Sequence, residues 1–171
     1  MIMVKSLLLL LVLAACAVMG CSARTQIVKT VEDGAGKDVI EILIKADPQL
    51  NLFEKSAHAL LLCLYQLKDP DGFNQLERAR GGVPKLLDCG RFDATVVDAR
   101  QFVVQPGEDL ADIRDRGEGA RYIGVATGYY SLGKEKVTGL SPLSTGGNDG
   151  SSGGVVRIEL GPHEIRSVRV R

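Results

Sequence analysis

The sequence contains no tryptophan, only four phenylalanines and four tyrosines, and only two histidines, His58 and His163. So few aromatic rings leave little surface on which a sugar could stack. Neither histidine has another histidine or a cysteine at the spacing of a metal ligand set. We therefore expect both histidines at the surface or at a strand edge, and we expect neither a metal site nor a cofactor.

Net charge is also missing, because 21 basic residues balance 21 acidic ones. This balance excludes the electrostatic footprint of a nucleic-acid-binding protein and predicts no polybasic patch for anionic lipid. The charge-rich segment Asp109–Glu118 mixes both signs, which is typical of a solvated face or a loop. Asp69–Gly72 indicates a turn, since the glutamate that closes a calcium loop is absent.

Catalytic motifs are absent as well. No GxSxG elbow occurs, and the serines of Gly139–Ser144 fall in what we interpret as a proline-containing loop. The glycine-rich stretch Gly146–Gly154 lacks the Lys-Ser/Thr ending of a phosphate-binding loop, so it indicates a flexible connection. A hydrolase would have to use one of the two histidines as its base. We therefore expect no enzymatic activity.

What the sequence does have is an export signal. Lys5 precedes an apolar run, Leu7–Gly20, that is shorter than the about 20 residues of a membrane-spanning helix. A charged start, a short apolar core and small residues before a cysteine are typical of a secretory signal peptide. We predict that residues 1–20 are this signal and are removed.

Two cysteines compete for lipid attachment at the cleavage point. Leu13–Cys16 fits the lipobox pattern well but leaves a short signal, whereas Val18–Cys21 gives an ordinary length and is followed by a polar serine. We favour lipidation of Cys21, with residues 21–37 as lipidated cysteine and flexible tether and residues 38–171 as the folded domain. An ordinary signal with incidental cysteines and a non-cleaved anchor are the alternatives.

After cleavage the folded part retains two cysteines, Cys63 and Cys89. In an oxidising compartment an even pair favours a disulfide, and two buried free thiols are the alternative. The absence of CxxC spacing argues against a thioredoxin-like redox site.

The hydropathy pattern of the folded part favours strands. Ile40, Ile42 and Ile44 alternate with polar residues in Val39–Ala46. Ala57–Leu67 is apolar on both faces, which indicates a central strand or, alternatively, a buried helix. Short helices are expected at Phe73–Ala79 and Val83–Leu87. Four further strands are expected, of which the last two form a pair joined by a turn. The expected strands are Phe92–Val104, Arg121–Tyr130, Val155–Leu160 and Ile165–Val170. This content predicts a β-sandwich with short inserted helices.

One connection is unusually apolar. Gln49–Lys55 joins the first two strands and places Leu50, Leu52 and Phe53 where a polar loop is expected. Exposed apolar residues in a loop often mark an interaction site. The alternative is that Leu50 or Phe53 folds back and closes the end of the sandwich, and one residue could do so while the others stay displayed.

Several segments in order resemble a known family. The first strand ends in Leu50-Asn51, the second in Leu64-Tyr65-Gln66-Leu67, and a helix begins at Phe73; Gln105-Pro106-Gly107 and the strand Ala120–Ala126 follow. This order is similar to the outer-membrane lipoprotein of type VI secretion systems, the TssJ (VasD/SciN-like) family, over Val39–Tyr130 and more loosely over the last two strands. The sequence departs from the family at Cys63, where many members carry a basic residue, and Gly146–Gly154 has no counterpart that we can map.

The resemblance implies a mainly β, two-sheet transthyretin-like sandwich without catalysis. It also implies a lipid anchor in the outer membrane, facing the periplasm, and binding to the periplasmic C-terminal region of TssM, which in turn pairs with TssL. The family's first loop contributes to TssM binding, which here corresponds to Leu50, Asn51, Leu52, Phe53, Glu54 and Lys55. The rival hypothesis is a periplasmic lipoprotein that binds a small ligand, or assists an enzyme, through a cleft of the sandwich.

Overall fold

The structure, a computed structural model, describes residues 39–130, 136–143 and 154–171. The predicted signal, Cys16, Cys21, the tether and most of Gly146–Gly154 lie outside these residues. In the described part of the chain, no helix is long and apolar enough to cross a membrane. The elements are β1 (Val39–Ala46), β2 (Leu60–Leu67), α2 (Asp71–Arg78), α3 (Gly82–Leu86), β3 (Val96–Val104), β4 (Asp109–Asp115), β5 (Tyr122–Thr127), β6 (Thr138–Pro142), β7 (Gly154–Leu160) and β8 (Ile165–Val170).

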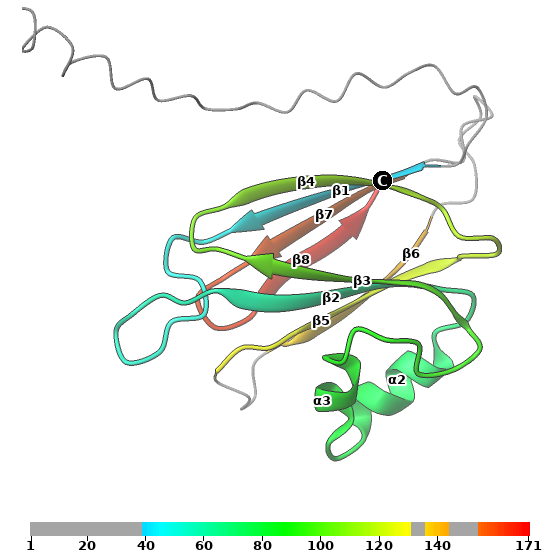
Figure 1. Cartoon of the computed structure of the whole chain (residues 1–171), viewed down its shortest axis with the longest axis horizontal. Helices are drawn as coiled ribbons and strands as arrows, with labels where there is room; N and C mark the ends of the chain where they lie inside the picture. Colours follow the sequence, from blue (N-terminus) through cyan, green and yellow to red (C-terminus); the bar gives the residue numbers. More distant parts are fainter. Residues whose placement is uncertain (1–38, 131–135, 144–153) are drawn as a thin grey trace, which may run out of the picture. The chain divides into compact units, whose positions relative to one another are not determined.

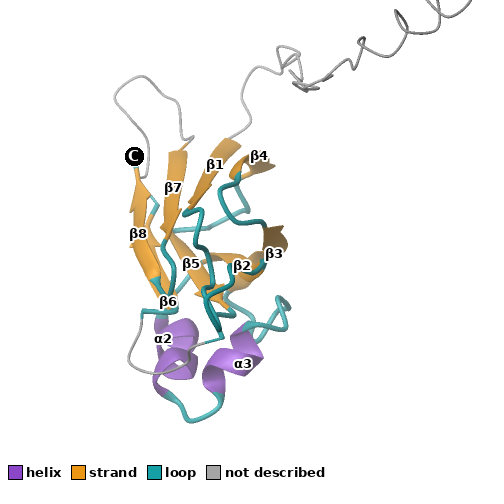
Figure 2. Ribbon diagram, turned by 90° about the vertical axis from the view of Figure 1, so that its left-hand side faces the viewer, coloured by secondary structure: helices purple, strands orange, loops and turns teal. Residues whose placement is uncertain are grey.

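The strands form two four-stranded sheets that pack face to face (Figures 1 and 2). The first sheet has the order β4-β1-β7-β8 and the second the order β3-β2-β5-β6. Only the β1–β7 pair is parallel among the described strand pairs. The predicted fold class, a mainly β two-sheet sandwich with short inserted helices, is confirmed.

The core between the sheets comes from strand residues of alternating burial. Ile40, Ile42 and Ile44 of β1 are buried, as are Leu60, Leu62 and Leu64 of β2. Burying one such side chain is worth about 1.5–3 kcal/mol. The apolar residues of the alternation predicted for Val39–Ala46 therefore form the inner face of a strand whose outer face meets solvent.

A second apolar cluster lies on the outer side of β2, under the two helices (Figure 2). Tyr65 and Leu67 point away from the sandwich core and pack against Phe73 of α2 and Leu86 of α3. The Tyr65 hydroxyl donates to the Leu86 carbonyl, and burial, with a smaller effect from Asp88, raises the pKa of Tyr65 to about 12. Ala57–Leu67 is thus a strand from Leu60 onward, covered on both faces, and the buried-helix alternative is wrong.

A disulfide joins this strand to the chain that follows α3. Cys63 and Cys89 are bonded, with their Cα atoms 5.1 Å apart and a sequence separation of 26. Cys89 has a positive φ of 50°, which few residues other than glycine adopt. The bridge therefore closes a loop that holds both helices against β2.

Two strands differ from the sequence-based expectation. Asp109–Asp115, expected to be a solvated face or a loop, is β4, an edge strand whose outward residues form a solvated face. Thr138–Pro142 is not a loop either; it pairs with β5 as β6, whose outer edge spares Pro142 from donating to a ladder. Both are edge strands, in which charged residues and proline prevent the unpaired side from pairing with another chain. The same residues interrupt the apolar pattern by which a strand is predicted from sequence.

Candidate protein-docking site

The apolar connection between β1 and β2 is anchored to the sandwich at Leu50. This side chain is fully buried in the core between the sheets. Its amide donates to the Asp47 carbonyl, and its own carbonyl accepts from the His58 amide at 3.0 Å. Of the two alternatives for Leu50, the structure shows the one in which it closes the end of the sandwich, so it offers no contact surface.

Asn51 is also buried and connects this loop to the end of β5. It has a positive φ of 49°, which asparagine tolerates better than most residues. Its side-chain amide donates to the Ala59 carbonyl at 3.0 Å, and its side-chain oxygen accepts from the Tyr130 amide at 2.9 Å. Asn51 therefore positions Tyr130 beside the loop instead of contacting a partner itself.

The tip of the loop is a two-residue turn. Phe53 and Ser56 exchange two backbone hydrogen bonds of 2.9 Å, and Glu54 and Lys55 between them both have positive φ values, 47° and 66°. Two central residues with positive φ are what a type I′ hairpin turn requires. Leu52 stands before this turn, half-buried, with its amide bonded to the Pro162 carbonyl at 2.8 Å.

Replacing the turn with Glu54→Asn and Lys55→Gly is expected to raise the free energy of unfolding by about 1–2 kcal/mol, because a left-handed conformation costs about that much for ordinary residues. Urea unfolding of residues 22–171 measures it. Placing the same two residues at the exposed positions Glu118 and Lys68 serves as the control and is expected to give no gain. A loss of stability in the turn variant would contradict the strained-turn assignment.

Three aromatic rings gather at this end of the sandwich. Phe53 stacks on Tyr130 with ring centroids 5.0 Å apart, and His58 meets the Tyr130 ring edge-on at 5.1 Å. Phe53 is 47% exposed and Tyr130 is 58% exposed, although both are large and apolar. We call Phe53, His58 and Tyr130 the aromatic cluster. Rings held together yet open to water form a ready contact surface for another protein.

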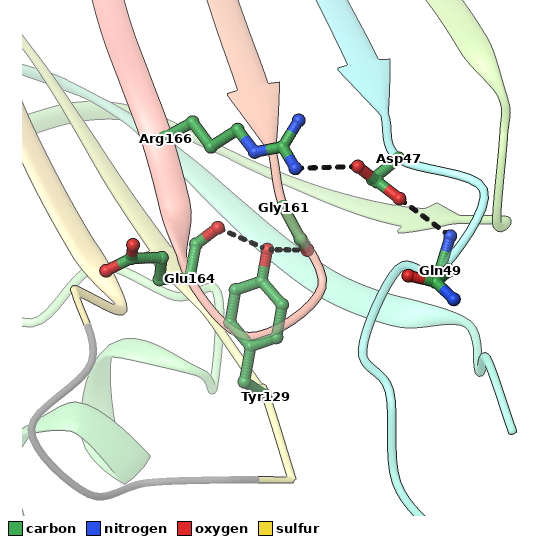
Figure 3. Close-up of polar contacts among 6 residues, drawn as sticks. All are labelled: Asp47, Gln49, Tyr129, Gly161, Glu164 and Arg166. Carbon is green, nitrogen blue, oxygen red and sulfur yellow. Dashed lines mark hydrogen bonds and ion pairs between the residues drawn. The ribbon is translucent and has the colours of Figure 1, made fainter. Parts of the chain in front are cut away.

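Polar contacts connect the chain segments at this end of the sandwich (Figure 3). Asp47 forms an ion pair with Arg166 of β8 at 2.7 Å. Its other carboxylate oxygen accepts a hydrogen bond from the backbone amide of Gln49 at 2.8 Å. The Tyr129 hydroxyl lies 3.0 Å from the Gly161 carbonyl and 2.9 Å from the Glu164 carbonyl. Burial raises the pKa of Tyr129 above its ordinary value, so the hydroxyl remains a donor.

These contacts join the loop after β1, the end of β5 and the β7–β8 turn, which lie at one end of the sandwich (Figure 1). The network fixes the loop before any partner arrives, so little conformational entropy is left to lose on binding.

The structure therefore separates the predicted loop residues into two groups. Leu50 and Asn51 lie in the interior, whereas Phe53, Glu54 and Lys55 are exposed and Leu52 is half-buried. Sequence reasoning missed Tyr130, which follows a strand far along the chain. It treated His58 as a surface or strand-edge residue and did not connect it with the other two rings.

The described residues offer little for chemistry at this end. No group of three or more metal-ligating side chains occurs among them. A hollow of about 320 Å³ adjoins the loop, lined by Lys45, Ala46, Asp47, Pro48, Glu159, Leu160 and Arg166. Its Asp47 and Arg166 are bonded to each other, so these two charges do not converge on a ligand.

Comparison with protein families identifies the family of this chain. Residues 38–161 match the family described as type VI secretion lipoprotein, whose names include VasD, EvfM and TssJ. The chain belongs to this family. The predicted resemblance is thereby confirmed, and the TssJ-family match extends through β7. No curated protein matched the chain.

Solved structures share the fold. TssJ1 of Pseudomonas aeruginosa, a type VI secretion lipoprotein, is 22% identical with a TM-score of 0.64, and the match covers 80% of this chain and 98% of that one. Serratia marcescens Lip, a membrane-bound component of the type VI secretion system, is 18% identical with a TM-score of 0.63, over 77% and 98%. A structure described as the TssM C-terminal domain from EAEC matches at 16% identity and a TM-score of 0.54, over 78% and 97%.

Proposed function

We propose that this TssJ-family lipoprotein docks the periplasmic C-terminal region of TssM and links it to the outer membrane, with TssL joined indirectly through TssM. The observation that carries the proposal is the exposed aromatic cluster on a rigid loop at one end of the sandwich. The family assignment and the fold match within a structure named for the TssM C-terminal domain support it.

The docking mechanism rests on shape and on a few apolar anchors. Most of the affinity of a protein interface comes from a small number of central residues, among which tyrosine is enriched. Here Phe53 and Tyr130 provide the apolar area, while Glu54 and Lys55 at the tip provide a charged rim. Because hydrogen bonds already fix the loop, the anchors meet the partner with little reorganisation.

The membrane link in this proposal is the lipid on Cys21. Three acyl chains exceed the two-signal threshold for stable anchoring, and the tether that follows gives reach. The role is mechanical: the sandwich transmits load between membrane and partner and needs no catalysis. Mass spectrometry of the mature N-terminus tests the site, with Cys21→Ser expected to lose the lipid and Cys16→Ser expected to keep it. The reverse result would move the anchor to Cys16.

The test of docking is calorimetric binding of residues 22–171 to the C-terminal periplasmic region of TssM from the same organism. We expect a one-to-one complex whose heat-capacity change is negative, because apolar surface is buried. Failure of the folded domain to bind would refute the docking function and favour the small-ligand hypothesis.

A further inference from the structure

The outer face of the first sheet carries a charge pattern that the docking function does not use. Alternate residues of β4, β1, β7 and β8 point away from the core. The strand register aligns them in rows across the sheet: Ile113, Glu41, Val155 and Arg171 in one row, then Ala111, Leu43, Arg157 and Arg169, then Asp109, Lys45, Glu159 and Ser167.

The apolar part of this face is exposed to water. Ile113 is 55% exposed and Val39 is 41% exposed, while Leu43 and Val155 beside them are half-buried. A hollow of about 310 Å³ opens here, and Leu43, Ala111 and Arg157 are among the residues that line it. Exposed apolar residues that gather on one sheet face, rimmed by charge, are typical of an interaction surface.

The charges are divided between the two halves of the face. β4 and β1 present Asp109, Asp115 and Glu41 against one cation, Lys45. β7 and β8, with the residue that follows β8, present Arg157, Arg169 and Arg171 against one anion, Glu159. The ion pairs found among the described residues, Asp112 with Arg114 and Asp47 with Arg166, involve none of these eight side chains. One half of the face is therefore acidic and the other basic.

We propose that this face binds a second copy of the same chain, sheet against sheet. A two-fold axis parallel to the strands, between β1 and β7, places β4 of each copy over β8 of the other and β1 over β7. Arg169 and Arg171 then face Ala111 and Ile113 of the second copy, and Asp109 and Asp115 lie diagonally from them, one row further along β4. Lys45 faces Glu159, and the apolar centre is covered from both sides.

The size of the face sets the strength of the contact. Four strands of this length cover about 20 by 20 Å at ordinary strand spacing. That is below the roughly 800 Å² per partner of a standard interface, so the pair is weak and depends on concentration. Copies confined to a membrane surface would reach the concentration at which such a pair forms. The docking loop remains free in this arrangement, because none of its residues lies on the face.

Cross-linking of the full-length chain in its own membranes tests the pairing. Two differently tagged copies are expressed together, one with Ala111→Cys and one with Arg169→Cys, and treated with a bismaleimide that bridges the ~10 Å between packed sheets. We expect a covalent product that carries both tags. Two copies with Ala111→Cys are the matched control, since this axis holds their β4 strands at opposite edges. Equal yields in the two experiments, or no product in either, would overturn the proposal.

A charge exchange separates specific pairing from general adhesion. Arg171→Glu in both copies is expected to reduce the mixed product roughly tenfold, since each exchange acts twice across a two-fold axis. Adding Asp115→Arg to both copies restores opposite charges and is expected to restore the yield. Both residues are exposed, and circular dichroism checks that the variants fold. An unchanged yield with Arg171→Glu, or no recovery in the double variant, would count against the pairing.

Discussion

Replacing Phe53 and Tyr130 together with serine is expected to weaken binding to the TssM C-terminal region about 1,000-fold, which equals about 4 kcal/mol at the about 2 kcal/mol typical of one anchor residue. The two rings stack at 5.0 Å and are about half exposed, so their removal takes away the apolar surface of the docking site. Calorimetric titration of residues 22–171 measures the loss.

The controls for this variant follow from the structure. Val103→Ser removes an apolar side chain of similar exposure, 55%, from an edge of the second sheet and is expected to leave binding unchanged. The serine variant should keep its unfolding midpoint, because neither ring lies in the core and Asn51 bonds to the backbone amide of Tyr130. Undiminished binding in the folded variant would place the TssM interface elsewhere on the sandwich.

Loss of the Cys63–Cys89 disulfide is expected to lower the free energy of unfolding by about 3–4 kcal/mol, the chain-entropy value for a loop of this length. The bridge spans 26 residues and encloses both helices, so its loss frees the unfolded chain and loosens the cover over Tyr65 and Phe73. Urea unfolding with and without reductant measures the change. Residues 22–171 contain no other cysteine.

A variant with Cys63→Ala and Cys89→Ala provides the control, because reductant should not alter its stability. Its unfolding midpoint is expected to match that of the reduced protein, apart from the small loss of packing stability that removal of the two sulfur atoms causes. TssM binding should survive at temperatures where the variant is folded, since the aromatic cluster packs on the sandwich end and not on the helices. A midpoint equal to that of the oxidised protein would show that the bridge adds no stability.

The strands that carry the core could be predicted because burial leaves a periodic pattern. In β1 every second residue is a buried isoleucine, and in β2 both faces are covered, so the whole segment is apolar. The edge strands β4 and β6 leave no such pattern. Asp112 and Arg114 face inward at an open edge, and Pro142 ends an edge strand, so polar residues and proline stand where a central strand would have apolar ones.

The docking loop could be predicted in part for the same reason. Apolar residues between two strands indicated an unusual connection, but composition does not say which of them faces water. Leu50 is buried because it fits between the sheets, and Phe53 is displayed because a turn with two positive φ values directs it outward. That choice depends on the space at the end of the sandwich, which both sheets define.

The sequence by itself determined the β-rich sandwich, the cysteine pair and the TssJ family, and it alone predicts the export signal, because each depends on local composition or on residue order along the chain. Only the tertiary structure brought Tyr130 to Phe53, 77 positions apart in the numbering. It also placed the arginines of β7 and β8 on one half of a sheet face and the acidic residues of β4 on the other half. Such surfaces come from strand order and register, in which neighbours are set by pairing across the sheet and not by distance in sequence.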